Sequence, residues 1–528
     1  MSKTNLHTTD TLIIGSGFGG AVTAATLCRH SLDVTLLERG PWRDSVPVAS
    51  MGIESRSPYP RQRHFYTHFL RNVEANLSER VSLPNLRLNR NGLYELFWDR
   101  QLLIACCSGV GGGSLGYSGL HHPPADPRYW HGVGDAIDPA TMTAYYEEFL
   151  QQMGSTRPDP AWQIPNHTVH MHRNNPLIGG DVANWWPWMG LKFRTGNRDD
   201  SNVQRLPSNY RNEGLLGAYS GSKTSLDFTY LEQAINDGLQ LRDCTEAMLI
   251  RPLPAHSGYR YAVTGYDHRR NVAVEYRTRQ LFLGAGTLNT LRLLLRSRAS
   301  TSGLQGMPLL GRGIATNADS IALWLRKDLG VDFSEGMSCH GTLAFRDGQD
   351  QAQFIQAGIS GLDEIPMPEL IRRQLRSWLF VTAMGEDRND GVAYWRNGRL
   401  RIRYSTRDSQ LHQHIFARFR QLRDHFGKPL LFSEKVAATL HPLGGVPIHD
   451  DPQRGVINSQ GELHDHPGLF VVDASALPKA PGMPPSMTVS AWSRHVAQQF
   501  LLAQATRPAT LTPSHRTDIF SVRHKELS

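Results

Sequence analysis

The chain has 528 residues, of which 40% are hydrophobic and 20% charged, and a net charge of +8. This length is too great for one simple core and predicts two domains or one large composite domain. No long apolar run and no leader with a basic end is visible, so we expect a cytoplasmic protein without a transmembrane segment. The basic residues are spread out, which argues against nucleic-acid binding and leaves peripheral contact with acidic lipids open.

A glycine-rich turn follows the first predicted strand. Thr11 to Ile14 are the strand residues, the segment Gly15–Gly20 fits the pattern G-x-G-x-x-G, and a helix-like segment comes next. In such a turn Gly15 allows the tight bend, Gly17 lets the backbone approach a pyrophosphate, and Gly20 lets helix and strand pack closely. The free N–H groups at the start of the helix favour phosphates. The sequence therefore predicts a dinucleotide site.

The second predicted strand, Val34 to Leu37, supports the same site. It ends in Glu38, whose carboxylate can accept hydrogen bonds from ribose hydroxyls. The pattern then dissolves into a stretch rich in proline, arginine and aromatic residues from Pro41 to Asn91, which includes His64 to Leu70. This stretch is either a mobile cover over a pocket or an irregular surface segment.

A second glycine cluster occupies Ser108 to Gly119. So many glycines predict a close approach of backbone to a ligand, and the apolar flanks make a flexible linker a poor alternative. Cys106 and Cys107 come directly before it, either as buried small residues or as a redox-active pair. The five cysteines lack metal spacing and fit reduced thiols; they are Cys28, Cys106, Cys107, Cys244 and Cys339.

The region from Pro124 to Ser222 is expected to be irregular. Its aromatic cluster, Trp185 to Trp188, either lines an apolar pocket or forms a core. His167, His170 and His172 look like a metal-binding tract, but no cysteine or carboxylate stands nearby at matching spacing. We therefore predict no metal site.

Regular structure returns in the second half of the chain. The region 317–426 alternates apolar and polar residues, which is typical of an antiparallel sheet, and a helix from about Leu411 closes it. A final block, 440–503, returns to the nucleotide site, and the tail beyond Thr506 is expected to be poorly ordered. The expected helices are 229–238 and 289–298, and the expected strands are 247–251, 259–266, 272–276, 280–283, 380–384 and 400–404.

Taken together, these blocks resemble the glucose–methanol–choline (GMC) family of flavin oxidoreductases, and within it the cholesterol oxidase branch. The resemblance covers almost the whole chain. It implies an α/β fold, with a Rossmann-like FAD-binding domain and a discontinuous α+β substrate domain built on an antiparallel sheet. The segments that carry it are Gly15–Gly20 with Glu38, Gly109–Leu115, Ser225–Leu231, Leu281–Gly286, His441–Gly445 and Val471–Asp473.

The resemblance also implies domain boundaries. The FAD-binding domain would comprise 1–45, 100–160, 223–316 and 438–505, the substrate-binding domain 46–99, 161–222 and 317–437, and the C-terminal tail 506–528.

The cofactor that the resemblance implies is FAD rather than NAD. Glu38 would hold the adenosine ribose, the backbone at Ala247 would meet the adenine, and the helix beginning at Ser486 would face the flavin pyrimidine. Some relatives tether FAD through a histidine where this chain has Gly116, so we expect noncovalent FAD. The expected cofactor-binding residues are Gly15, Gly17, Phe18, Gly19, Gly20, Glu38, Gly112, Gly113, Ser114, Tyr117, Ser118, Ala247, Gly284, Asp473, Ala474, Pro485 and Ser486.

His441 is the candidate catalytic residue. Its loop resembles the active-site loop of the cholesterol oxidase branch, whose histidine lies near the flavin and the substrate hydroxyl. An imidazole titrates near neutral pH, so it can accept the alcohol proton or orient the hydroxyl while hydride passes to the flavin. Taken alone, a histidine before a proline is more typical of a structural residue.

Two departures from the family affect the expected chemistry. Relatives place an asparagine or a histidine beside the catalytic histidine, but here that position is Pro484, which has neither a side-chain donor nor a backbone N–H. Cholesterol oxidases also carry a glutamate that shifts the steroid double bond, and the corresponding region 375–378 has no carboxylate. Glu364 or Glu369 would have to reach the pocket from elsewhere.

The expected activity is oxidation of the CH–OH group of a bulky, apolar, sterol-like or terpenoid-like small molecule. Oxygen or another acceptor would reoxidise the flavin. The alternative is a redirected FAD enzyme of the same fold, such as a lyase, isomerase or desaturase, and Pro484 favours that reading.

Overall fold

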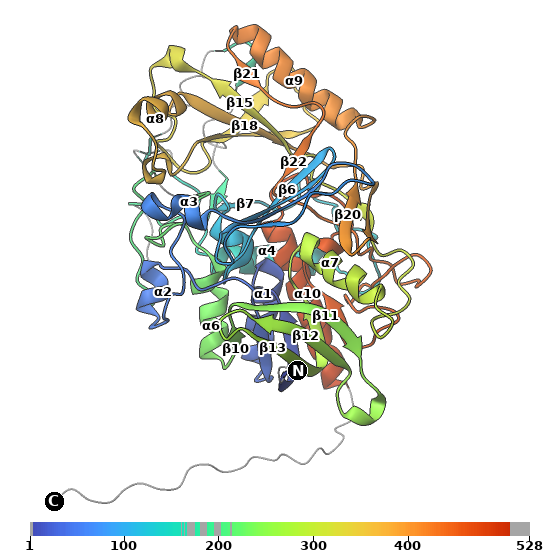
Figure 1. Cartoon of the computed structure of the whole chain (residues 1–528). Coiled ribbons are helices and arrows are strands. Elements are labelled where there is room, and N and C mark those ends of the chain that lie inside the picture. Colours follow the sequence, from blue (N-terminus) through green and yellow to red (C-terminus); the bar gives the residue numbers. More distant parts are fainter. Residues whose placement is uncertain are drawn as a thin grey trace, which may run out of the picture.

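The structure is a computed structural model that describes residues 4–159, 161–162, 164–165, 175–179, 187–194, 202–211 and 214–506. Figure 1 shows one body around a mainly parallel sheet and a second body around an antiparallel sheet. This arrangement confirms the predicted fold class. No helix in the described parts of the chain is long and apolar enough to cross a membrane.

The larger body is built on a seven-stranded sheet with the order β10-β2-β1-β13-β12-β11, in which β23 also pairs with β13. Its central strands are parallel and buried on both faces, which explains their continuous apolar runs. Strands β11 and β12 join the edge as antiparallel partners. The bounds are β1 Asn5–Ile14, β2 Val34–Leu37, β10 Gln240–Arg242, β11 Thr245–Pro252, β12 Tyr261–Asp267, β13 Val272–Leu283 and β23 Leu469–Val471.

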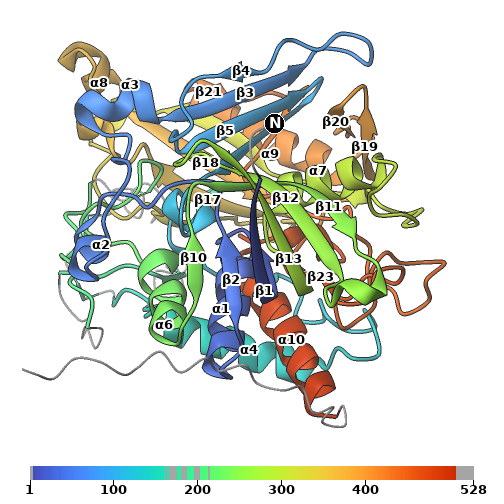
Figure 2. The same ribbon diagram turned by 60° about the horizontal axis from the view of Figure 1, so that its bottom comes forward.

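Helices α1 and α10 lie beside this sheet, with α6 packed on α1 and α4 packed on α10 (Figure 2). Helix α1 comes very close to β1, because a Cβ on Gly20 would lie 1.8 Å from the carbonyl oxygen of Gly15. A fifth helix, α7, packs on β11. The bounds are α1 Phe18–Arg29, α4 Pro139–Gln152, α6 Tyr230–Asn236, α7 Thr287–Arg298 and α10 Ser486–Ala505.

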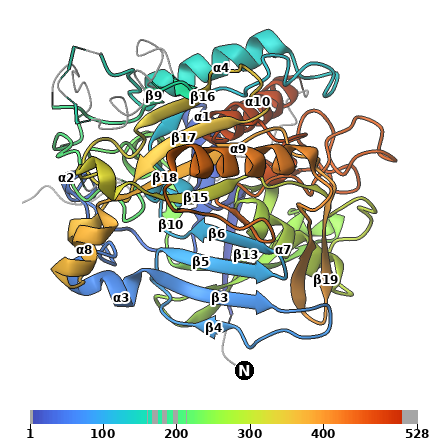
Figure 3. The same ribbon diagram turned by 90° about the horizontal axis from the view of Figure 1, so that it is seen from above.

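The second body is a six-stranded antiparallel sheet with the order β21-β15-β18-β17-β16-β8. Helix α9, Gln410–Phe426, lies across it in the view of Figure 3. The side chains of Trp324, Phe354 and Phe419 form part of the shared core. The strands are β8 Ile178–Gly179, β15 Ser320–Leu325, β16 Gly341–Phe345, β17 Gln353–Gly358, β18 Trp378–Met384 and β21 Leu430–Leu431.

A five-stranded sheet, β22-β6-β5-β3-β4, lies between the two bodies (Figure 1). It takes strands from both sides of the predicted domain boundaries, and that division stays a prediction. A further sheet joins β14, β19 and β20. The remaining bounds are β3 Leu70–Asn76, β4 Leu86–Arg87, β5 Tyr94–Asp99, β6 Leu102–Cys107, β7 Leu120–His121, β9 Trp188–Met189, β14 Arg312–Ile314, β19 Gly391–Arg396, β20 Arg399–Arg403, β22 Ala437–Thr439, α2 Val46–Ser50, α3 Phe65–His68 and α8 Glu369–Leu375.

The stretch 41–91 is more regular than its sequence indicates, since it contains α2, α3, β3 and β4. The reason lies in β3, where Arg71, Glu74 and Asn76 are buried. Glu74 pairs with Arg292 at 2.9 Å. Because charged side chains occupy buried positions of this strand, the usual alternation of apolar and polar residues is absent.

Two strand predictions were wrong in extent or in partner. The segments 272–276 and 280–283 form the single strand β13, because Thr278 is paired on both sides, with Thr9 and with Tyr261. The segment 400–404 corresponds to β20, which pairs with β19 rather than joining the antiparallel sheet. Its side chains Leu400 and Ile402 pack into the core of the larger body.

Candidate active site

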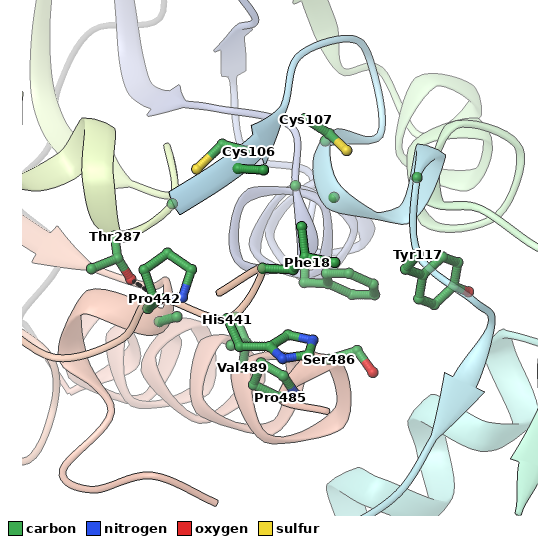
Figure 4. Close-up of a pocket in the computed structure, with 18 of the residues that line it drawn as sticks. Phe18, Cys106, Cys107, Tyr117, Thr287, His441, Pro442, Pro485, Ser486 and Val489 are labelled. Atoms are coloured by element: carbon green, nitrogen blue, oxygen red, sulfur yellow. Dashed lines mark hydrogen bonds between the residues drawn. The ribbon is translucent and has the colours of Figure 1, made fainter. Parts of the chain in front are cut away.

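A cavity of about 500 Å³ is lined by residues from the parallel, five-stranded and antiparallel sheets. Its nucleotide end is formed by the first glycine turn, Glu38 and the second glycine cluster. Its substrate end is formed by side chains of the antiparallel sheet. His441 lines the same cavity, beside Pro485 and Ser486 (Figure 4). The substrate end is lined by Leu120, Ile321, Ile355, Phe380, Thr382 and Met384.

The first glycine turn leaves backbone exposed to the nucleotide end. Gly15 has a φ of +95°, and a Cβ there would lie 2.5 Å from the carbonyl oxygen of Gly284. Gly17 is different, because a Cβ there would meet only Gly112 Cα, at 4.0 Å. Helix α1 begins at Phe18 without a side-chain cap. Its first N–H groups are therefore available to an anion beside Gly17.

Glu38 is a buried carboxylate that organises this end of the cavity. It accepts hydrogen bonds from Ser16 N at 3.1 Å, Ser16 Oγ at 2.7 Å and Gly40 N at 2.7 Å. A carboxylate offers about four acceptor positions. One acceptor position remains for a ligand hydroxyl, and the other three hold the turn in place.

The second glycine cluster lies directly against the first, because a Cβ on Gly112 would come within 2.6 Å of Gly17 Cα. Gly111 and Gly112 have φ angles of +105° and +54°, which favour glycine. Ser114 is buried below the loop, where its hydroxyl donates to Gly111 O at 2.7 Å and accepts from Leu226 N at 3.0 Å. The Tyr117 hydroxyl donates to Thr224 O at 2.7 Å, and burial raises its pKa.

Asp473, which lines the cavity, joins its own segment to the start of α7. It accepts from Gly286 N at 2.9 Å, from Ser475 N at 2.9 Å and from the hydroxyl of Thr290. Burial raises the pKa of this carboxyl. The neighbouring Ala474 also lines the cavity.

His441 is held by a carboxylate that the sequence did not reveal. Its Nδ1 lies 3.0 Å from Asp319 Oδ1 and 2.9 Å from Oδ2, and its backbone N–H donates to Thr439 Oγ1 at 2.8 Å. Thr439 Oγ1 in turn donates to Asp319 Oδ2 at 2.7 Å. Because Nδ1–H donates to Asp319, Nε2 is left as the acceptor in the neutral imidazole.

The amino end of α10 forms the wall beside His441, as Figure 4 shows. The helix begins at Ser486 without a side-chain cap, and Pro484 lines the same wall. Ser486 Oγ and Thr488 Oγ1 are buried, and neither has a hydrogen-bond partner among the described residues. An electron-rich group fits at this helix end, where the dipole is positive. The preceding loop is fixed by Asn317, which donates to Met483 O and accepts from Gly482 N.

The structure brings nearly all of the predicted site residues to this one cavity. Only Gly20 and Ser114 lie outside its lining, as packing residues behind it. Asp319 and Asn317 were missed, because neither stands in a recognisable motif. The only hint in the sequence is the residue type of Asn317, because asparagine tolerates the positive φ of +60° that the structure has there. One asparagine is too common a residue to predict such a position.

Several other candidates are also placed. Cys106 and Cys107 line the cavity, and burial raises the pKa of the Cys107 thiol to about 11, which disfavours the reactive thiolate. Neither Glu364 nor Glu369 lines it. Trp185, Trp186 and the three histidines of the proposed metal tract lie outside the described residues.

Comparison with known proteins agrees with this geometry. A family model for an NAD(P)-binding Rossmann-like domain matches residues 13–41, and one for the GMC oxidoreductase C-terminal domain matches residues 403–493, which include His441 and Pro484. The chain therefore carries a GMC oxidoreductase C-terminal domain behind a Rossmann-like nucleotide-binding segment. The protein is an FAD-dependent oxidoreductase, as predicted. The open Gly17 backbone, the remaining acceptor of Glu38 and the unpaired hydroxyl of Ser486 fit such a cofactor.

Relatives resemble the chain over most of its length. A cholesterol oxidase from Acinetobacter baumannii is 24% identical over 95% of this chain and 96% of its own. A cholesterol oxidase from Mycobacterium tuberculosis (strain CDC 1551 / Oshkosh) is 24% identical over 96% of this chain and 91% of its own. The crystal structure of pyridoxine 4-oxidase from Mesorbium loti covers 94% of this chain and 99% of its own at 15% identity, with a TM-score of 0.52. That last likeness concerns the fold alone.

Proposed function

We propose that this FAD-dependent oxidoreductase oxidises the CH–OH group of a bulky, apolar, sterol-like or terpenoid-like alcohol. The observation that carries the proposal is the His441–Asp319 pair, which leaves Nε2 as an acceptor on a residue that lines the cavity shared by the nucleotide end and the substrate end. Two relatives named as cholesterol oxidases support an apolar alcohol as substrate.

The substrate end suits a molecule that is apolar except at one place. Its lining side chains are mainly aliphatic or aromatic, with a few hydroxyls such as Ser338 and Thr382. Such a wall favours burial of rings or branched hydrocarbon, while a small number of polar groups sets the orientation. The carbinol end of the substrate would then lie at His441.

The residues that would hold FAD are those of the nucleotide end. The turn at Gly17 and the start of α1 would bind the pyrophosphate, Glu38 a ribose hydroxyl, and Ser486 the flavin edge. When bound, FAD supplies the acceptor for the hydride that leaves the carbinol carbon. A tethering side chain at position 116 has no room, because a Cβ on Gly116 would lie 2.3 Å from the Tyr94 hydroxyl. We therefore expect FAD to be released when the protein is denatured.

His441 acts as the base in this proposal. Its Nε2 accepts the proton of the substrate hydroxyl, and the Asp319 carboxylate stabilises the imidazolium that forms. Asp319 also selects the tautomer, because it accepts the Nδ1–H. Pro484 lines the wall but offers no hydrogen-bond donor. His441 would therefore orient the substrate hydroxyl without the second polar side chain that relatives place beside it.

A redirected FAD enzyme is the second candidate, and Pro484 is the observation that favours it. In that case the cavity would bind an apolar substrate, but the proton handled by His441 would come from carbon rather than from a hydroxyl. The two candidate functions therefore differ in the substrate that is bound, while the fold is the same.

Anaerobic mixing with a panel of sterols, terpenols and small secondary alcohols tests the proposal. We expect bleaching of the oxidised flavin absorbance by at least one bulky alcohol and weaker bleaching by small alcohols. Readmitting oxygen then tests whether oxygen is the acceptor. A protein that retains FAD, yet is not bleached by any alcohol and converts an apolar substrate without net oxidation, would establish the redirected function instead.

A further inference from the structure

A second, smaller cavity of about 110 Å³ lies behind the pair that orients the proposed base. It shares Asp319, Ser320 and Ile321 with the main cavity, so the Asp319 carboxylate is reached from two sides. Its other walls come from α9 and from the segment that follows β21. It is lined there by Thr406, His412, Phe416, Phe419, Phe432, Ser433, Val436, Ala437 and Ala438.

His412 has an unpaired ring nitrogen, and the residue lines this cavity. The residue is 0% exposed, and its Nδ1 lies 2.9 Å from Ser409 Oγ. The Ser409 hydroxyl accepts the backbone N–H of His412 and can donate its own proton to Nδ1. In that tautomer the imidazole proton is on Nε2, which is buried and has no partner among the described residues.

Asp319, which lines the same cavity, offers a matching acceptor. Among the described residues, Oδ2 accepts from Thr439 Oγ1 and from the backbone N–H of Leu440, and Oδ1 accepts from His441 Nδ1. A carboxylate oxygen has two acceptor positions, so one on Oδ1 remains. The cavity exceeds the roughly 10–15 Å³ that a water molecule needs.

The charges around His412 are consistent with a neutral donor. Burial lowers the pKa of His412, and the nearby carboxylates of Asp387 and Asp319 oppose that effect. Tyr404 is the other titratable neighbour, with ring centroids 6.3 Å apart, and its hydroxyl donates to Asp387 at 2.7 Å. His412 thus stays neutral while it faces the carboxylate that supports the base.

We propose that the second cavity binds water that joins His412 Nε2–H to Asp319, so that His412 is a positioning residue for the His441–Asp319 pair. The positioning role of His412 rests on the proposed function, whereas the water site can be tested without it. The donated hydrogen bond stabilises the charge and the orientation of Asp319.

A crystal structure of the FAD-loaded enzyme at high resolution tests the site without any assay. We expect ordered water within hydrogen-bond distance of both His412 Nε2 and Asp319 Oδ1, and loss of that water in His412→Phe. A second cavity without such water overturns the proposal, whatever the substrate proves to be.

The kinetic test compares three variants. His412→Phe keeps the ring shape but removes the donor, and we expect flavin reduction to slow about two- to tenfold, as loss of one hydrogen bond predicts. The acid limb of its pH profile should move to higher pH, because an unsolvated Asp319 attracts the imidazole proton more strongly. His412→Gln retains an N–H donor and should recover most of the rate. His414→Phe, on the same helix but outside both cavities, is the matched control.

The outcomes separate the two claims. If no alcohol reduces the wild-type flavin, the proposed function fails, and the water site is judged by the crystal structure. If alcohols reduce it but His412→Phe leaves the rate and the acid limb at their wild-type values, the positioning role is overturned. A slower rate without a shift of the acid limb also counts against that role, because a packing defect alone produces it.

Discussion

The two ends of the main cavity are built by different means. At the nucleotide end, the cavity wall is formed mainly by backbone atoms. Gly15 and Gly112 adopt positive φ angles there, and Gly17 leaves open space beside the start of α1. At the substrate end, side chains from β15, β17 and β18 form the walls. The comparison teaches that a backbone-built site tolerates almost no added atom, whereas a wall of side chains can change its shape while the fold remains.

The largest expected effect comes from adding a methyl group at the nucleotide end. Gly20→Ala would place Cβ 1.8 Å from Gly15 O, with backbone on both sides of the contact. We expect a loss of more than about 3 kcal/mol of stability, because a buried overlap of this kind cannot relax. Thermal unfolding measures it. Gly17→Ala is the matched control: its Cβ meets only open space, so the protein should fold and yet fail to retain FAD. Equal stability of Gly20→Ala and wild type would contradict the close packing.

Removing the base should leave the nucleotide end intact. His441→Ala should bind FAD normally but lower the rate of flavin reduction by a factor on the order of 10²–10⁴, the usual contribution of a positioned base. Asp319→Asn should cause a similar or smaller loss, because it favours the wrong tautomer. Stopped-flow absorbance measures the rate, and flavin content per protein provides the control. If both variants lose FAD in proportion to activity, His441 is structural.

Pro484→Asn tests whether the wall beside His441 faces the reacting centre. A donor there can stabilise developing charge by up to about 3 kcal/mol, so turnover of small secondary alcohols should rise by as much as about 10². For the redirected function, the same change should impair the native reaction without creating alcohol oxidation. FAD content must stay at the wild-type level, since Pro485 and Ser486 belong to the same loop. Unchanged kinetics with every substrate would place Pro484 away from the chemistry.

The smallest expected effect concerns Glu38. Glu38→Gln keeps one acceptor oxygen but cannot satisfy Ser16 and Gly40 as well as a ligand hydroxyl, so FAD affinity should fall about tenfold. Fluorescence titration of the FAD-free protein measures this value. The rate of flavin reduction in the FAD-saturated variant should remain unchanged, which separates this end of the cavity from the other. A slower rate at saturation would mean that the turn also positions the flavin.

Local sequence determined the nucleotide end because its geometry depends on nearby residues. The strand, the G-x-G-x-x-G turn and Glu38 lie within one short segment. Each glycine of the turn is required by the backbone conformation or by close packing within that segment. The same holds for the strands predicted at 34–37 and 380–384, where apolar runs or alternation are clear. The antiparallel second sheet and the FAD cofactor followed from motifs in the same order as in the family.

Tertiary structure alone decided the partners of His441. Asp319 stands far from it in the chain and in no motif. The contact of β22, which pairs with β6, with β15 brings Thr439, Asp319 and His441 together. The buried charges of β3 were likewise invisible, because Glu74 is tolerated there only through its pairing with Arg292. Long-range ion pairs and hydrogen bonds satisfy buried polar groups at positions where the sequence pattern has no period. For that reason the nucleotide turn could be predicted from the sequence, whereas the support of the proposed base required the folded chain.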